Sequence, residues 1–302
     1  MSLRPVNRIV AAKPTMEGAG VKLHRAFGFG DTSDFDPFLL FDDFRNDRPQ
    51  DYLSGFPWHP HRGIETITYV LAGSVDHGDS LGNRGQLGAG DVQWMTAGSG
   101  ILHQEMPRGD AAGRMHGFQL WANLPSAHKM TTPRYQDVPA VEIPEIVDDD
   151  GTVVRIVCGD FWGRTGPVEG IAADPRYLDV SVPPGKRKTL AVETDRHAFA
   201  YVFAGSGTFA GASQPFGVLT ERGTPDAELL IREKTGNRSL VLFDTGDEVT
   251  VQAGDEGVRF LLVSGKPLKE PVAWHGPIVM NTQAELRTAI DELRAGTFIK
   301  HG

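Results

Sequence analysis

The sequence predicts an all-β protein made of two tandem β-barrels and a short C-terminal helix. Thirty-six glycines and twenty prolines separate short runs rich in Val, Ile, Phe, Tyr and Thr, which is typical of many strands joined by tight turns. Residues 69–74 (YVLAGS) recur as residues 201–206 (YVFAGS), and a Gly-Asp pair follows each copy, at residues 90–91 and 246–247. We therefore expect the same β architecture twice.

The strands are expected where apolar and β-branched residues cluster between turn signals. Residues 64–71 give the clearest pattern, because apolar residues first alternate and then merge into a run typical of a buried strand end. Further strands are expected at residues 91–95, 115–121, 177–182, 190–192, 199–203, 240–243, 249–252 and 258–263.

Two helical segments interrupt this pattern. Thr282 and Glu285 have the spacing of a capping box, and Leu286, Ile290 and Leu293 keep helical spacing after it. A C-terminal helix should therefore extend to about Arg294. A shorter helical turn is expected at residues 126–129.

The repeat divides the chain into two domains with a linker. Residues 136–151 contain Pro139, Pro144 and three consecutive aspartates, a composition typical of a linker. We expect an N-terminal barrel at residues 1–135, the linker at 136–151, and a C-terminal barrel at 152–302.

Composition and charge exclude several classes of protein. With 40% hydrophobic and 23% charged residues, the chain contains no apolar run near the roughly 18 residues of a membrane helix, and its start lacks a secretory signal. We therefore expect a cytoplasmic protein without membrane contact. A net charge of −9 without a large basic cluster argues against direct nucleic-acid binding. Cys158 is the single cysteine, which excludes an intramolecular disulfide, and we expect a buried, inert thiol.

Two short pairs, His59-x-His61 and His103-x-Glu105, indicate a metal site. Both lie in segments typical of strands, and alternate strand residues point to the same face, so each pair can bind one ion with two side chains. A carboxylate other than Glu105 also competes for the role of ligand. Glu65 has the same parity as the histidines, although Gly63 could bend the strand and turn Glu65 away.

The donor types narrow the choice of metal. No thiolate accompanies the imidazoles, so a Cys-rich structural zinc site is excluded, while imidazole with carboxylate suits iron, manganese, nickel, copper or zinc. Four protein ligands would fill a tetrahedral zinc but leave two positions open on an ion that prefers six. Catalysis therefore favours Fe(II) or a similar metal.

These residues resemble the motifs of a known family. His59, His61 and Glu65 followed by Gly73 resemble the first cupin motif, and residues 90–103 resemble the second. More narrowly, the sequence resembles the pirin family over essentially the whole chain. The resemblance is carried by residues 60–69 (PHRGIETITY), 90–98 (GDVQWMTAG), 100–107 (GILHQEMP), 117–121 (GFQLW) and 276–281 (GPIVMN).

This resemblance implies both a fold and an activity. Pirins are bicupins, with two jelly-roll barrels and iron in the N-terminal barrel. By motif, the metal ligands are His59, His61, His103 and Glu105, with Glu105 also the catalytic base and Glu65 a non-ligand. Several members open the central ring of flavonols such as quercetin with O2. Others are described as redox-sensing iron proteins that regulate a protein partner, and a sugar isomerase on the same barrel is a more distant alternative.

The second barrel is expected to lack this site. The repeat places Ala191, Glu193 and His197 where the first barrel has His59, His61 and Glu65, and no His-x-Glu follows residue 247. In the first barrel, His77 and His116 are intermediate candidates, since either could support the metal ligands or form part of the pocket wall. Candidate pocket walls, each with plain core packing as the alternative, are Phe56, Trp58, Trp94, Met95 and Phe118.

Overall fold

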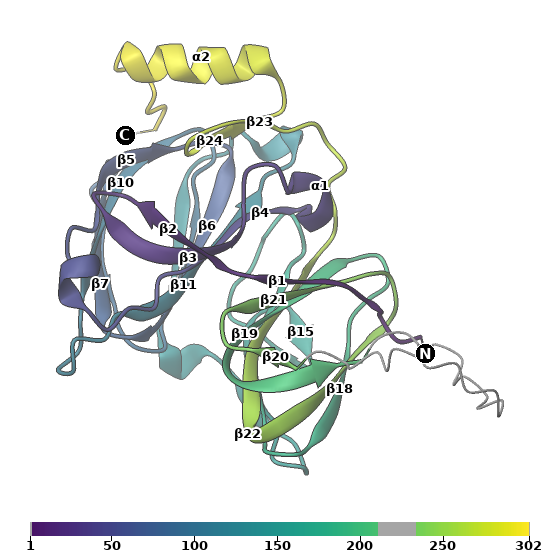
Figure 1. The fold of residues 1–302 in the computed structure, drawn as a ribbon. Helices are drawn as coiled ribbons and strands as arrows, with labels where there is room; N and C mark the ends of the chain where they lie inside the picture. Colours follow the sequence, from purple (N-terminus) through teal and green to yellow (C-terminus); the bar gives the residue numbers. More distant parts are fainter. Residues whose placement is uncertain (1, 211–233, 302) are drawn as a thin grey trace, which may run out of the picture. The chain divides into compact units, whose positions relative to one another are not determined.

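The structure is a computed structural model that describes residues 2–210 and 234–301. Strands dominate these residues, which also include two α-helices, α1 (Thr32–Phe35) and α2 (Gln283–Arg294) (Figure 1). The chain forms two compact units, each assembled from separate stretches of the sequence. The expected β class, with a short C-terminal helix, is confirmed.

The first unit contains the described residues within Met1–Ala11, Glu145–Arg155 and Tyr177–Ser264. Its strands form one sheet in the order β1-β21-β19-β22-β17-β14-β13, with β18 paired to β22 and β20 paired to β19. These strands are β1 (Val6–Ala11), β13 (Glu145–Val147), β14 (Val153–Cys158), β17 (Arg176–Val182), β18 (Arg187–Ala191), β19 (His197–Phe209), β20 (Thr235–Gly236), β21 (Ser239–Phe243) and β22 (Glu248–Gly265).

The second unit contains the described residues within Ala12–Pro144, Ile156–Arg176 and Gly265–Gly302. A seven-stranded sheet has the order β12-β9-β6-β11-β4-β3-β2, and a four-stranded sheet has the order β5-β10-β7-β8. Two small hairpins, β15–β16 and β23–β24, complete the unit. The strands are β2 (Lys13–Glu17), β3 (Val21–Phe27), β4 (Phe38–Asp43), β5 (Phe56–His61), β6 (Ile64–Ala72), β7 (Ser74–Asp79), β8 (Arg84–Leu87), β9 (Val92–Thr96), β10 (Ile101–Arg108), β11 (His116–Asn123), β12 (Arg134–Val138), β15 (Asp160–Phe161), β16 (Arg164–Thr165), β23 (Ala273–His275) and β24 (Ile278–Met280).

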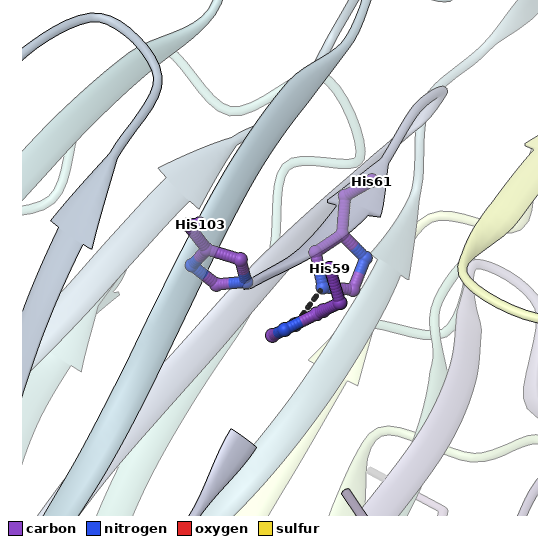
Figure 2. A group of neighbouring side chains, drawn as sticks. All are labelled: His59, His61 and His103. Carbon is purple, nitrogen blue, oxygen red and sulfur yellow. Dashed lines mark hydrogen bonds between the residues drawn. The ribbon is translucent and has the colours of Figure 1, made fainter. Parts of the chain in front are cut away.

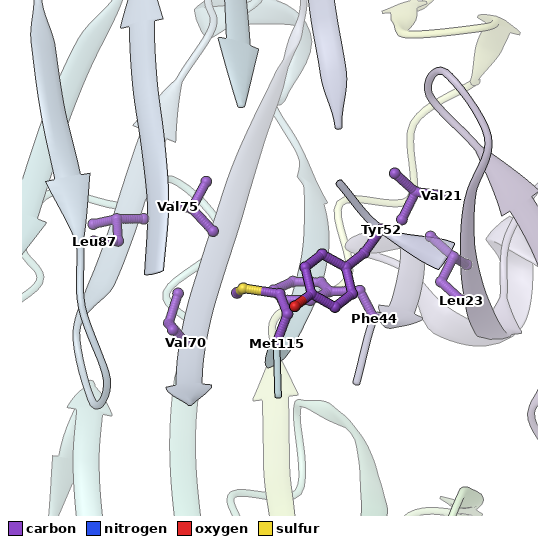
Figure 3. Packing of buried hydrophobic residues seen from close by; sticks show 8 residues of the cluster. All are labelled: Val21, Leu23, Phe44, Tyr52, Val70, Val75, Leu87 and Met115. Atoms are coloured by element: carbon purple, nitrogen blue, oxygen red, sulfur yellow. The ribbon is translucent and has the colours of Figure 1, made fainter. Parts of the chain in front are cut away.

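An apolar cluster packs between the two sheets of the second unit. Its side chains come from β3, β6, β7, β8 and the adjoining loops, and they point toward one another in Figure 3. The members are Val21, Leu23, Phe44, Tyr52, Val70, Val75, Leu87 and Met115. This cluster holds the two sheets together beside the histidine-bearing strands.

The repeated sequence forms the same local structure twice. β6 and β19 carry the two copies, and the glycines that follow the apolar run, Gly73 and Gly205, have positive φ angles of 80° and 62°. A Cβ atom at Gly73 would lie 2.6 Å from the carbonyl oxygen of Arg108, and one at Gly205 would lie 2.2 Å from that of Gly257. Only glycine fits both positions without strain.

Two expected strands differ from the observed ones. Residues 249–252 and 258–263 belong to one long strand, β22, because Gly257 takes a φ angle of 78° and lets the strand continue through a bend. The expected linker, residues 136–151, contains the end of β12, a 3₁₀ turn (Ala140–Glu142) and the short strand β13. The other expected strands are present at or near their expected bounds.

The C-terminal helix begins at the expected cap. The Thr282 side chain accepts a hydrogen bond from the Glu285 backbone N–H at 3.2 Å, and the Glu285 carboxylate accepts one from the Thr282 N–H at 2.8 Å. The predicted capping box is therefore confirmed, as is the end of the helix at Arg294. The expected turn near residue 126 is a 3₁₀ helix (Ser126–His128). No helix in the described part of the chain is long and apolar enough to cross a membrane.

Candidate metal centre

Two neighbouring strands of the four-stranded sheet position the three histidines. β5 and β10 are antiparallel, and His103 lies directly opposite His59 in their register. Side chains directly opposite on such strands lie on the same face and in contact. His61 follows His59 by two residues and therefore points to the same side. The expected pairing of the two motifs is present.

The three imidazole rings converge (Figure 2). Their ring centroids are 4.4 Å apart for His59 and His103, and 4.9 Å apart for the other two pairs. One nitrogen from each ring lies within 4.8 Å of the others, which makes this group able to hold a metal ion. Among residues 2–210 and 234–301, no other group of three His, Cys, Asp or Glu side chains meets this criterion.

The ring nitrogens are arranged as metal donors would be. The Nε2 atoms of His59 and His61 lie 3.1 Å apart, a separation that suits two adjacent ligands with bonds of about 2.1 Å to one cation. His59 Nδ1 is 2.9 Å from the carbonyl oxygen of Pro57, to which it can donate, and this leaves Nε2 with a free lone pair. Both ring nitrogens of His103 are buried without a hydrogen-bond partner. A cation held by the three rings would give one of these two His103 nitrogens a partner.

Burial keeps two of the rings neutral. His61 and His103 are only 2% and 1% exposed. Desolvation, followed by the nearby imidazoles, lowers the pKa of both well below 6.5. Both rings therefore present lone pairs rather than N–H⁺ groups at neutral pH, as metal binding requires.

Glu105 lies beside the three imidazoles but does not belong to the group whose ligand atoms all lie within 4.8 Å of one another. The register of β5 and β10 shifts by one extra residue on β5, so Glu105 pairs with Phe56, three residues before His59. One Glu105 carboxylate oxygen lies 3.9 Å from His103 Nε2, and the other lies 3.4 Å from Thr68 Oγ1. Desolvation raises the pKa of Glu105.

Glu65 points to different partners. Gly63 has a φ angle of 76° and turns the chain between β5 and β6. Glu65 is then buried, and one of its oxygens accepts a 2.7 Å hydrogen bond from the Thr96 hydroxyl. Burial raises the pKa of Glu65. Neither the group of imidazoles nor the adjoining cavity includes Glu65.

A cavity of about 600 Å³ opens beside the histidines. His59, His61 and Glu105 line it together with residues from the seven-stranded sheet and the C-terminal segment. A volume of this size suits a small organic ligand of several rings. The site therefore joins a set of metal donors to a space for a substrate.

The cavity walls differ from those expected. Of the candidate wall residues, only Phe56 lines this cavity. Trp94, Met95 and Phe118 are fully buried core residues, and Trp58 is half exposed and borders a separate surface hollow. Phe118 lies on the opposite face of β11 from Gln119, which lines the cavity, and Trp94 and Met95 lie on opposite faces of β9.

Sequence reasoning missed several aromatic wall residues. Tyr52, Trp121 and Trp274 line the cavity, and the rings of Trp121 and His61 meet edge to face at 5.1 Å. Trp121 lies two residues after Gln119, so strand parity could have found it. Trp274 comes from the hairpin β23–β24, and no local signal links that hairpin to the histidines.

The other two histidines expected near the site have separate roles. His77 lies opposite Glu105 in the register of β7 and β10, stacks on Tyr135 at 5.9 Å, and has its Nε2 atom 3.0 Å from Gln93 Nε2. It borders the surface hollow rather than the main cavity. His116 pairs with Asp47 at 2.6 Å and lines neither.

The two β units and the convergent histidines define a bicupin with one candidate metal centre. The family model for pirin matches residues 20–122, and that for the pirin C-terminal cupin domain matches residues 177–299. The chain belongs to the pirin family, as the sequence resemblance predicted.

Known relatives cover nearly the whole chain. A pirin-like protein from Caulobacter vibrioides is 43% identical over 99% of this chain and 100% of its own length. Human pirin is 37% identical over 97% of this chain and 92% of its own. The crystal structure of a protein named quercetin 2,3-dioxygenase from Acinetobacter baumannii superposes with a TM-score of 0.84 at 30% identity, over 98% of this chain and 99% of that one.

Proposed function

We propose that this protein is a mononuclear iron-dependent dioxygenase that opens the central ring of flavonols such as quercetin with O2. The observation that carries the proposal is the convergence of three imidazoles, two of which line a cavity large enough for a flavonol. The name of the Acinetobacter relative gives the reaction class.

His59, His61, His103 and Glu105 would hold the metal. The three rings already lie within mutual reach of one ion, and the Glu105 carboxylate, 3.9 Å from His103 Nε2, completes the set. Such a set leaves two positions open on an ion that prefers six ligands, which favours Fe(II), while manganese, nickel, copper and zinc also accept these donors. When bound, the metal would acidify the flavonol 3-hydroxyl and supply the redox chemistry for O2.

Glu105 is the base in this proposal. It lines the cavity, and burial raises its pKa, so it holds a proton more readily than an exposed glutamate. Glu105 would accept the proton of the 3-hydroxyl, and Thr68, whose Oγ1 lies 3.4 Å away, borders the carboxylate. Trp121 and Trp274 would hold the flat rings and exclude water.

Oxygen consumption tests this function. Protein loaded with Fe(II) is mixed with quercetin in air, and O2 uptake, quercetin loss and carbon monoxide release are measured together. We expect equal amounts of all three, because both oxygen atoms enter the opened product and one carbon leaves as carbon monoxide. A His103→Ala variant should lose both metal and turnover.

An iron-replete sample that consumes no O2 with any flavonol would contradict the enzymatic proposal. The remaining candidate would then be an iron protein whose oxidation state changes its affinity for a protein partner. Turnover that proceeds equally well without O2 would instead indicate an isomerase.

A further inference from the structure

A row of polar side chains crosses the seven-stranded sheet along the cavity wall. Thr68 on β6 lies opposite Gln119 on β11, Gln119 lies opposite Asp42 on β4, and Asp42 lies opposite Arg25 on β3. All four line the cavity. The row starts beside Glu105, because Thr68 Oγ1 lies 3.4 Å from an oxygen of that carboxylate.

Hydrogen bonds hold these four side chains in place but leave donor and acceptor groups that a ligand could use. The Thr68 hydroxyl donates to Gln119 Oε1 at 2.8 Å, whereas Gln119 Nε2 has no hydrogen-bond partner within residues 2–210 and 234–301. Arg25 donates to the two oxygens of Asp42 at 2.8 and 2.7 Å. Each Asp42 oxygen keeps a second lone pair, because a carboxylate can accept about four hydrogen bonds.

Asp42 is an unusual group for this wall. It is 5% exposed, and desolvation raises its pKa to about 6 in spite of the adjacent Arg25. At neutral pH it is therefore an ionised acceptor. The surfaces around it are largely apolar, including Leu23, Phe44 and Met115 from the cluster in Figure 3.

The spacing of the row matches a multi-ring ligand. Neighbouring strands lie about 4.8 Å apart, so Asp42 is about 10 Å from Thr68 along the row. A flavonol bound through its 3-hydroxyl and 4-oxo groups at the histidines would extend its outer rings in this direction. Hydroxyl groups on those rings would then meet Gln119 and Asp42.

We propose that Asp42 and Gln119 make the site selective for flavonols that carry hydroxyl groups on their outer rings. Asp42 accepts a hydrogen bond from one such hydroxyl, and the Gln119 amide donates to another. This inference rests on the proposed flavonol chemistry of the same site, and it names the subclass of substrate.

Anaerobic binding measures this selectivity without turnover. The ligands are 3-hydroxyflavone, which has no outer hydroxyl, galangin, with two on the fused ring, and quercetin, with two more on the pendant ring. Quenching of the cavity tryptophans, Trp121 and Trp274, reports each Kd for iron-loaded and metal-free protein. We expect quercetin to bind at least about tenfold more tightly than 3-hydroxyflavone, as one hydrogen bond to a charged group can provide.

Two substitutions and one matched control test the residues. Asp42→Asn and Gln119→Leu should each reduce the preference for quercetin severalfold while changing the Kd of 3-hydroxyflavone little. Asp43→Asn makes the same chemical change at the next residue, which pairs with Arg45 and does not line the cavity. This control should keep the preference.

The outcomes separate this inference from the proposed function. If wild-type protein binds all three flavonols equally, or if neither Asp42→Asn nor Gln119→Leu changes the preference, the inference is wrong even when quercetin is turned over. If Asp42→Asn does not fold, Gln119→Leu decides alone. If binding shows the preference but O2 is never consumed, the selectivity stands and the dioxygenase proposal fails.

Discussion

Glu65 is a buried carboxylate on β6 and Glu105 a partly buried one on β10, and the two have different neighbours. Glu105 faces the histidines and the cavity, whereas Glu65 accepts from Thr96. We expect Glu105→Gln to weaken iron binding roughly tenfold or more and to abolish turnover, because an amide is a poorer ligand and no base. Glu65→Gln should retain iron, as measured by metal analysis after dialysis. The reverse result would assign the carboxylate ligand to Glu65.

The buried imidazoles give the metal-free protein a defined response to acid. The pKa of His61 and of His103 lies well below 6.5 in the folded state, so below pH 6.5 the unfolded chain binds protons that the folded chain excludes. Stability must then fall as pH falls through this window, by up to about 1.4 kcal/mol per pH unit for each ring. Urea unfolding of metal-free protein at pH 7.5, 6.5 and 5.5 measures this slope.

Substitutions identify which imidazole rings cause this dependence of stability on pH. His103→Asn should make the slope shallower, whereas His128→Gln, at an exposed position, should leave it unchanged. Equal slopes in wild type and His103→Asn would contradict the assignment.

The three histidines of the candidate metal centre could be predicted from the sequence, but the cavity beside them could not. His59, His61 and His103 stand out because a second donor two residues away is rare by chance and has a direct geometric meaning on a strand. The cavity depends instead on which face of each buried strand points inward. Trp94 and Phe118 are aromatic, as cavity-wall residues often are, yet their side chains face the core. Trp274 reaches the cavity only through tertiary packing.

At the level of elements, a buried lysine attaches the hairpin β23–β24 to the turn beside the histidines. The Lys129 ammonium donates to the carbonyl oxygens of Gly63 and Val279, at 2.8 and 3.0 Å, and to the Asn123 side chain at 2.5 Å. These three acceptors match its three N–H groups, although burial lowers the pKa of Lys129 to about 7.

We expect Lys129→Met to lower the free energy of unfolding by about 3 kcal/mol, because three buried acceptors lose their donor. Lys266→Met removes a lysine whose ion pair with Asp174 is half exposed, and it should cost less than about 0.5 kcal/mol. Urea unfolding compares the two. Equal losses would show that the buried lysine contributes no more than a surface one.

The elements themselves were largely predictable, unlike their pairing. The cap at Thr282 and the strand at Ile64–Ala72 follow from local patterns that tertiary structure did not override. The merging of two expected strands into β22 depends on Gly257, which could equally have ended a strand. Sheet order depends on contacts between distant residues, which local periodicity does not encode.

For the whole molecule, the repeat predicts one metal ion per chain rather than two. The second unit has three convergent imidazoles, whereas the first unit has Ala191 and Glu193 at the places that correspond to His59 and His61 in the repeat. Metal analysis of purified, iron-loaded protein should give one equivalent, and a His59→Ala/His103→Ala double variant should give none. A second equivalent that survives this double substitution would reveal a site in the other unit.

Each unit contains a segment from the opposite end of the sequence. The N-terminal strand β1 pairs with β21 in the unit built mainly from later residues. Trp274 and Val279, which accepts a hydrogen bond from Lys129, instead belong to the unit that contains the histidines. A nascent chain leaving the ribosome therefore exposes all three imidazoles long before their last wall exists. The complete cavity wall can therefore form only after the segment beyond residue 265 has been synthesised.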